Sequence, residues 1–183
     1  ISACNLIYYT WSVFKKGIRP HAYTWVIWGI VTVIAAIGQY QGHGGYALIH
    51  LCFVACACFV IAFLGVIKGK NLITRSDTMC LMGCFVAIAL LFATDNLLLS
   101  IILVTCIDLS GFYPTIRKSW KNPHNENHTS FFLYGVCFSL QIAAIENYNA
   151  LTTLYPSAIA LASFALAIYL VRRQKIVKSV ALR

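Results

Sequence analysis

The chain has 183 residues, of which 60% are hydrophobic and 10% are charged. Because soluble domains are about 25% charged, this composition excludes an ordinary soluble globule and indicates a polytopic membrane protein. The formal net charge is +9. The basic residues flank apolar segments and form no continuous face, so we do not expect nucleic acid as a partner.

Apolar segments of about 20 residues can cross a bilayer as helices, since every backbone polar group must be paired inside the lipid. The sequence contains seven such segments, at 1–16, 21–40, 44–66, 78–92, 96–116, 130–145 and 150–171. Turn-rich links such as 41–45 separate them. The expected fold class is therefore an all-α membrane protein with seven transmembrane helices.

Basic residues are confined to the links after the first, third and fifth segments and to the C-terminal tail. They are Lys15, Lys16, Arg19, Lys68, Lys70, Arg75, Arg117, Lys118, Lys121, Arg172, Arg173, Lys175, Lys178 and Arg183. Cytoplasmic links of membrane proteins are rich in lysine and arginine. We therefore expect an outside N-terminus and a cytoplasmic C-terminus in a multi-pass protein of the cell membrane, in particular a bacterial inner membrane.

Two parts of the chain resemble each other. Residues 5–21 match residues 108–124 without gaps, which aligns Asn5 with Asp108, and residues 24–29 match residues 130–135. We therefore predict one three-helix repeat in 1–70, a linker helix in 71–95 and a second repeat, with its basic tail, in 96–183. The linker helix keeps the two repeats parallel, and such 3+1+3 repeats occur in transporters that bind solute between the halves.

Asp108 is an acid deep in an apolar segment. At a rise of 1.5 Å per residue it lies roughly 18 Å from the outer end, near the bilayer centre. Acids at that depth commonly bind substrate or carry protons; the structural alternative is a carboxyl group that pairs with Ser or Tyr hydroxyls. Asn5 would be its neutral counterpart. Pro114 is a candidate hinge, and the alternative is a proline that simply lies near a helix end.

Four more residues complete the expected solute site. Trp28 and Tyr134 are aligned in the repeat and could hold a ring between them, or could belong to the aromatic belt at the membrane surface. His50 could contact solute, accept a proton or make a hydrogen bond between helices. Gln141 is a polar group at the midplane. Pro156 is expected to break the seventh segment, as an outer gate or a kink.

Other classes of site have little support. The eight cysteines lie within apolar segments, without histidine at zinc-like spacing, so we expect buried filler and no disulfide, metal or cofactor. The sequence shows no Ser/His/Asp set and no paired carboxylates at depth. We therefore expect no catalytic residues and no enzyme activity.

The stretch Phe-Tyr-Pro-Thr-Ile-Arg-Lys-Ser at 112–119 resembles the motif of helices 1 and 5 in the SWEET / PQ-loop superfamily, where Pro-Gln or Pro-Thr precedes a basic stretch. The 3+1+3 layout is also similar to that of the bacterial PnuC vitamin transporters. The resemblance implies transport of a small polar solute, such as a sugar, amino acid or nucleoside-like vitamin. Of the hinge prolines that the family has in helices 1, 2, 5 and 6, only Pro114 is present.

Two interpretations remain open from the sequence. The first is a transporter that works by alternating access in the lipid bilayer, coupled to protons through Asp108 and compatible with a homo-oligomer. The second is a non-transporting membrane sensor or accessory subunit with the same fold, since fold does not determine function.

Overall fold

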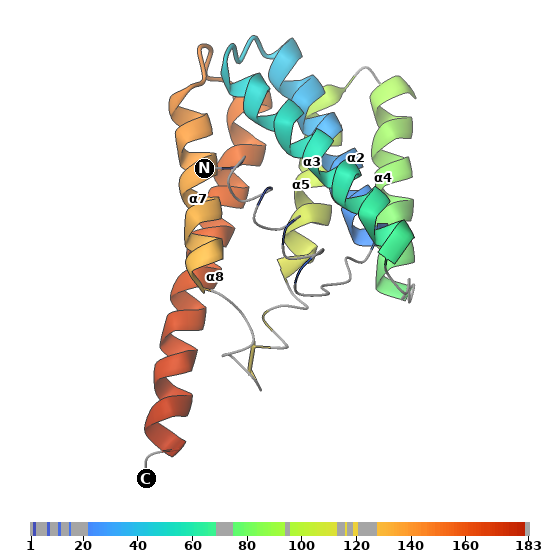
Figure 1. The fold of residues 1–183 in the computed structure, drawn as a ribbon. Coiled ribbons are helices and arrows are strands. Elements are labelled where there is room, and N and C mark those ends of the chain that lie inside the picture. Colours follow the sequence, from blue (N-terminus) through green and yellow to red (C-terminus); the bar gives the residue numbers. More distant parts are fainter. Residues whose placement is uncertain are drawn as a thin grey trace.

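The computed structural model describes residues 22–68, 75–93, 96–112 and 128–181, together with residues 2, 7, 11, 15, 116, 119 and 120. All regular secondary structure in these parts of the chain is helical, which confirms the expected all-α class (Figure 1). The helices are α2 (Ala22–Gln41), α3 (Ala47–Lys68), α4 (Arg75–Ala93), α5 (Leu97–Ser110), α7 (His128–Ala143) and α8 (Ala150–Ala181). They correspond to the second to seventh expected segments.

Helix α8 differs most from the expectation. It continues to Ala181, well past the expected end at residue 171, and Pro156 lies inside it. The helix is therefore not interrupted at Pro156, and the role of Pro156 as a gate or a kink stays a prediction. A proline removes one backbone donor, but in apolar surroundings the remaining backbone groups must stay paired within the helix, so one missing bond does not unwind it.

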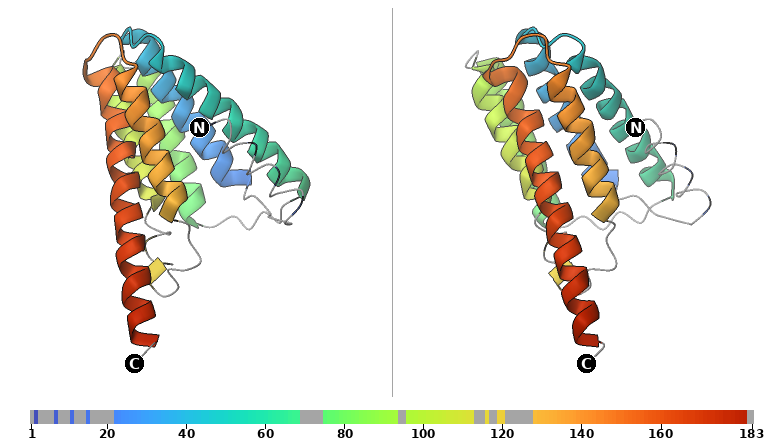
Figure 2. Two further views of the ribbon diagram at one scale, coloured as in Figure 1. Left: turned by 60° about the vertical axis from the view of Figure 1, so that its left-hand side comes forward. Right: turned by 90° about the vertical axis from the view of Figure 1, so that its left-hand side faces the viewer.

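Two helix pairs form the frame of the bundle. α2 packs along α3, and α7 packs along α8, each pair being joined by a short link (Figures 1 and 2). α5 contacts both α2 and α8, and α4 packs against α5. The core between them is apolar, with Val31, Ile101, Phe138 and Ile159 fully buried.

The buried positions of α3 recur in α8 at a constant spacing of 105 residues. The pairs are Ala47 and Thr152, Leu51 and Pro156, Ala55 and Ala160, Cys58 and Ser163, Ile61 and Leu166, Ala62 and Ala167, and Gly65 and Leu170. The two helices therefore bury the same face.

A close glycine–phenylalanine contact also occurs in both pairs. Gly29 of α2 lies against the ring of Phe59 in α3, and Gly135 of α7 lies against the ring of Phe164 in α8. A Cβ atom at either glycine would stand 2.8 Å from a ring carbon. Gly29 and Gly135 are aligned in the sequence repeat, and the two phenylalanines have the spacing of the buried positions. Glycine allows the helices of each pair to approach closely.

The two short links contact each other at one end of the bundle (Figure 1). The Asn149 side-chain Nδ2 donates a hydrogen bond to the Gly42 carbonyl at 2.8 Å, and the Glu146 N–H donates to the Gly44 carbonyl at 3.2 Å. Gly45 has a φ of 62°, and the Glu146 side chain lies where a Cβ at Gly45 would stand. Glycine is therefore required there for both conformation and space.

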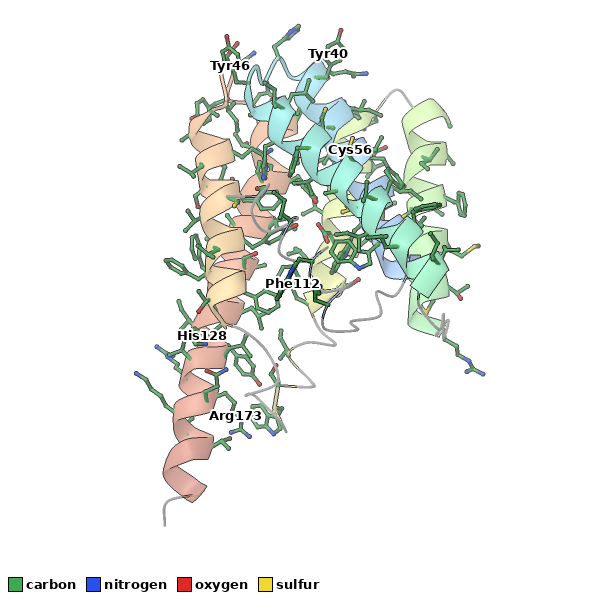
Figure 3. All side chains as sticks on the ribbon, in the orientation of Figure 1. Tyr40, Tyr46, Cys56, Phe112, His128 and Arg173 are labelled. Carbon is green, nitrogen blue, oxygen red and sulfur yellow. The ribbon has the colours of Figure 1, made fainter. Side chains whose placement is uncertain are left out.

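The ends of the bundle differ in charge. The links at 42–46 and 144–149 contain no lysine or arginine. At the opposite end, α3 finishes at Lys68 and α4 begins at Arg75. Arg173 lies in the part of α8 that is furthest from the links (Figure 3).

Two of the described helices are long and apolar enough to cross a membrane, judged by length and composition: Ala47–Ile67 and Ala150–Val177. Three shorter helices are also apolar, at Trp25–Gln41, Leu97–Ser110 and Phe131–Ala143. The full set of seven spans and the orientation of the termini stay predictions.

The contact between Gly135 and Phe164 leads to a test of the packing of α7 on α8. Gly135→Leu should lower the free energy of unfolding by about 1–3 kcal/mol, because the added side chain must displace the phenylalanine ring. Thermal unfolding of the purified protein in detergent would show a lower midpoint. Ala143→Leu adds a larger side chain at an exposed position of the same helix and is the control. Equal midpoints for the two variants would contradict the packing.

Candidate functional site

Asp108 lies near the end of α5 with its side chain buried inside the bundle. The Tyr155 hydroxyl of α8 donates a hydrogen bond to Asp108 Oδ2 at 2.7 Å. Tyr155 is itself 2% exposed, and its hydroxyl is also within hydrogen-bonding reach of Thr32 in α2. Because a buried polar group without a partner is costly, this bond satisfies the carboxyl group and connects α5 to α8.

Aromatic rings surround the carboxyl group. The Phe138 ring packs edge-on against the rings of Tyr155 and Tyr134, with centroids 6.0 Å and 5.0 Å apart. Tyr134 of α7 and Cys58 of α3 both lie within electrostatic range of Asp108. Side chains of α2, α5, α7 and α8 that bond or pack with one another form what we call the Asp108 cluster: Thr32, Asp108, Tyr134, Phe138 and Tyr155.

His50 and Gln141 form a second polar group. His50 Nδ1 lies 2.7 Å from Gln141 Oε1, and His50 Nε2 lies 3.1 Å from the Ser2 hydroxyl. Gln141 is 3% exposed, and its amide Nε2 has no hydrogen-bond partner within the described part of the chain. All three residues line a cavity of about 480 Å³ between α3 and α7. The buried amide nitrogen of Gln141 is therefore a donor without a partner in the described part of the chain.

The repeat relates this cavity to a groove that is filled in the other half of the bundle. α5 occupies the groove between α2 and α8, where Ile101 lies directly against Gly38. The equivalents of the buried Ile34 and Gly38, 106 residues later, are Leu140 in α7 and Ala144 just after it, and both are exposed and line the cavity. The cavity between α3 and α7 is thus the counterpart of the α5 groove.

Trp28 covers the end of α5. Its indole Nε1 lies 3.5 Å from the place that a Cβ on Gly111 would take, and the Gly111 N–H donates to the Asp108 carbonyl at 3.0 Å. Phe112, labelled in Figure 3, packs against Phe131 of α7 with ring centroids 6.5 Å apart. Aromatic rings from α2, α5 and α7 therefore close the bundle on this side of Asp108.

The structure separates the predicted site residues into groups. Asp108 and Tyr134 share the Asp108 cluster, Trp28 lies beside it, and His50 pairs with Gln141. Phe138 connects the groups, because its ring also lies 5.2 Å from the His50 ring. Asn5 and Pro114 lie outside the described residues. Pro156 is buried in α8.

Tyr155 was not among the predicted site residues, although it makes the direct bond to Asp108. The signal that could have identified it is its position 105 residues after His50, the spacing at which the buried face of α3 recurs in α8. Apolar helices match one another in many registers, so this spacing is visible only once the buried faces are known.

Comparison of the chain with protein-family models, curated proteins and solved structures found no match. Within the described residues, no group of three or more His, Cys, Asp or Glu side chains could hold a metal ion. The resemblance to the SWEET / PQ-loop superfamily therefore stays a prediction.

The bond between Tyr155 and Asp108 can be tested through stability. Tyr155→Phe should lower the free energy of unfolding by about 1–3 kcal/mol, because it leaves a buried carboxyl group without its donor. Denaturant titration in detergent would measure the change. Tyr148→Phe removes an exposed hydroxyl that donates to the Ile142 carbonyl and should have a smaller effect.

A double-mutant cycle separates the bond itself from general damage to the core. Tyr155→Phe and Asp108→Asn should be non-additive, since both substitutions alter one interaction. Strictly additive losses would show that the bond contributes nothing to stability.

Proposed function

We propose that the protein is a multi-pass membrane transporter that moves a small polar organic solute by alternating access, with a proton carried by Asp108. Sugars, amino acids and nucleoside-like vitamins are the solute classes. The observation that carries the proposal is a buried carboxyl group, on α5, that is bonded to Tyr155 of α8 among apolar helices. Ionisable groups in such positions mark substrate and proton pathways in membrane proteins.

The outer surface of the helices supports a position in the lipid bilayer. Large apolar side chains are exposed along the described helices, for example Phe63 at 66%, Met79 at 75% and Leu161 at 71%. Soluble monomers seldom expose extended apolar patches of this kind. Lys68 and Arg75 lie at the end of the bundle opposite the short links, so the positive-inside rule favours links that face outside and a cytoplasmic C-terminus.

The shared features of the two helix pairs support the 3+1+3 plan. α3 and α8 bury equivalent faces, and Gly29 and Gly135 make equivalent contacts. The groove between α3 and α7 would then hold the first helix, as the groove between α2 and α8 holds α5. Ser2, which lines that groove and lies 3.1 Å from His50, agrees with this arrangement.

Alternating access requires that the two halves tilt about a site between them. In this structure the short links contact each other through Asn149 and Gly42, and in the proposed orientation this contact would hold the outer end closed. Asp108 lies below this contact, where α5 and α8 meet. Opening toward the outside would separate the links, and a solute hydroxyl or amine could replace Tyr155 as the donor to Asp108.

One observation favours the second candidate, a non-transporting sensor or accessory subunit. Asp108 lines neither the cavity between α3 and α7 nor the other large cavity, on α8. In such a protein the Asp108 cluster would be a fixed contact between helices. Flux measurements separate the two candidates, because a sensor binds solute without moving it.

The orientation can be tested in bacterial cells. A green fluorescent protein fused after Arg183 should fluoresce, since it folds in the cytoplasm, whereas alkaline phosphatase inserted after Gly44 should be active, since it requires the outside. Fluorescence lost after Arg183, together with inactive phosphatase after Gly44, would reverse the proposed orientation.

The transport proposal predicts a specific effect of Asp108→Asn. A thermal-shift screen first identifies a solute that stabilises the folded protein. Proteoliposomes with an inward proton gradient should accumulate that solute, and Asp108→Asn should abolish the stimulation by the gradient, because the amide cannot release a proton. Glu146→Gln removes an exposed carboxylate and should leave the stimulation intact.

Two outcomes would contradict this proposal in different ways. Gradient-stimulated uptake that survives in Asp108→Asn would remove Asp108 from proton coupling. Solute binding by the wild-type protein without any flux would favour the sensor.

A further inference from the structure

A cavity away from the Asp108 cluster lies on the C-terminal part of α8. It has a volume of about 490 Å³ and lies between this helix and the segment that contains Trp120. The residues that line it are of two kinds, aromatic or apolar and basic, and include Trp120, Ile168, Tyr169, Arg172, Arg173 and Ile176. Arg173 marks its position in Figure 3.

Hydrogen bonds hold this cavity in shape. Arg173 donates from both Nε and Nη2 to the Trp120 carbonyl, at 3.2 Å and 2.8 Å, and its guanidinium carbon lies 4.3 Å from the centroid of the Trp120 ring. The Tyr169 hydroxyl donates to the Ile116 carbonyl at 3.4 Å. Hydrogen bonds from α8 therefore hold two residues beside the cavity, Ile116 and Trp120.

The charge of the site favours an anion. α8 contains Arg172, Arg173 and Lys175 within four residues, and it has no acidic residue along its whole length. Arg172 is exposed, so its guanidinium group is available at the rim, and arginine binds phosphate oxygens through two parallel hydrogen bonds.

The depth of the site fits the headgroup region of the bilayer. About 20 helical residues cross the hydrocarbon core, so a span that begins at Ala150 reaches the cytoplasmic boundary near Tyr169. Tryptophan and tyrosine are enriched at this boundary. Leu161 and Ile168 are exposed on α8, at 71% and 54%, and Ile168 also lines the cavity. The two positions are seven apart, so they share one helix face.

We propose that this cavity binds an anionic phospholipid of the cytoplasmic leaflet. Arg172 and Arg173 contact the phosphate, Trp120 and Tyr169 lie at the level of the glycerol, and an acyl chain runs along Ile168 and Leu161. The apolar strip above the arginines favours a lipid over a free phosphate ion, which has no chain to place there. The proposal relies on the membrane orientation proposed above and is independent of transport.

Native mass spectrometry of the purified protein in detergent tests this proposal. With phosphatidylglycerol and phosphatidylcholine in equal amounts, the wild-type protein should retain phosphatidylglycerol selectively. Arg172→Gln should reduce that retention about tenfold, which corresponds to about 1.4 kcal/mol, because a charge-assisted hydrogen bond to the phosphate is lost. Arg75→Gln removes an exposed basic residue at the start of α4 and should leave the retention unchanged.

Several outcomes would overturn the proposal. These are equal retention of the two lipids, an equal loss in Arg172→Gln and Arg75→Gln, or displacement of the lipid by inorganic phosphate at the same concentration, which would indicate a site for free phosphate. Because Arg172 is exposed, Arg172→Gln should leave the thermal midpoint in lipid-free detergent unchanged. Trp120→Ala changes the same site without changing its charge and should also weaken retention of the lipid. If the wild-type protein takes up solute but shows no preference between the two lipids, the lipid proposal is overturned and the transport proposal is not.

Discussion

The hydrogen bond from the Tyr155 hydroxyl to the Asp108 carboxyl group constrains the whole bundle. A carboxyl group surrounded by apolar helices must have a partner, because an unpaired buried polar group costs several kcal/mol. That requirement sets the register of α8 against α5, since Tyr155 must lie beside Asp108 at 2.7 Å. The same register buries Ile159 one turn further along α8 and leaves Phe138 in contact with the Tyr155 ring.

The two helix pairs use one scaffold for different chemistry. α3 and α8 bury equivalent faces, but where α8 has Tyr155, α3 has His50. Tyr155 bonds to α5, and His50 bonds to Gln141 of α7 and to Ser2. The half that contains α5 therefore has a buried carboxyl group bonded to Tyr155, whereas the equivalent position of α3 has the imidazole of His50, bonded to an amide and a hydroxyl. Such an asymmetry suits a transporter in which one half carries the ion and both halves contact the solute.

Much of the helical architecture could be predicted from the sequence, and the reasons for the failures are physical. The lengths of the apolar segments and the basic residues between them predict the positions of the described helices well, because both mark where one apolar helix ends and the next begins. The end of α8 was missed because a helix can continue into water after its apolar residues end. An interruption of the helix at Pro156 was expected, but α8 continues through this residue because the neighbouring backbone hydrogen bonds hold it. Tyr155 was missed because the pairing of helices depends on register, and leucine-, isoleucine- and alanine-rich sequences fit one another in many registers.

The central claim is that the Asp108 carboxyl group, bonded to Tyr155, takes up and releases the proton that accompanies solute movement. Infrared difference spectroscopy of the protein in lipid bilayers, between acidic and alkaline pH, tests it most directly. If Asp108 carries the proton, the protein should show a carboxylic-acid band that disappears at alkaline pH and is absent from Asp108→Asn. The band should also shift in Tyr155→Phe and change when solute is added. A band that is the same in Asp108→Asn, or that does not respond to pH and solute, would contradict it.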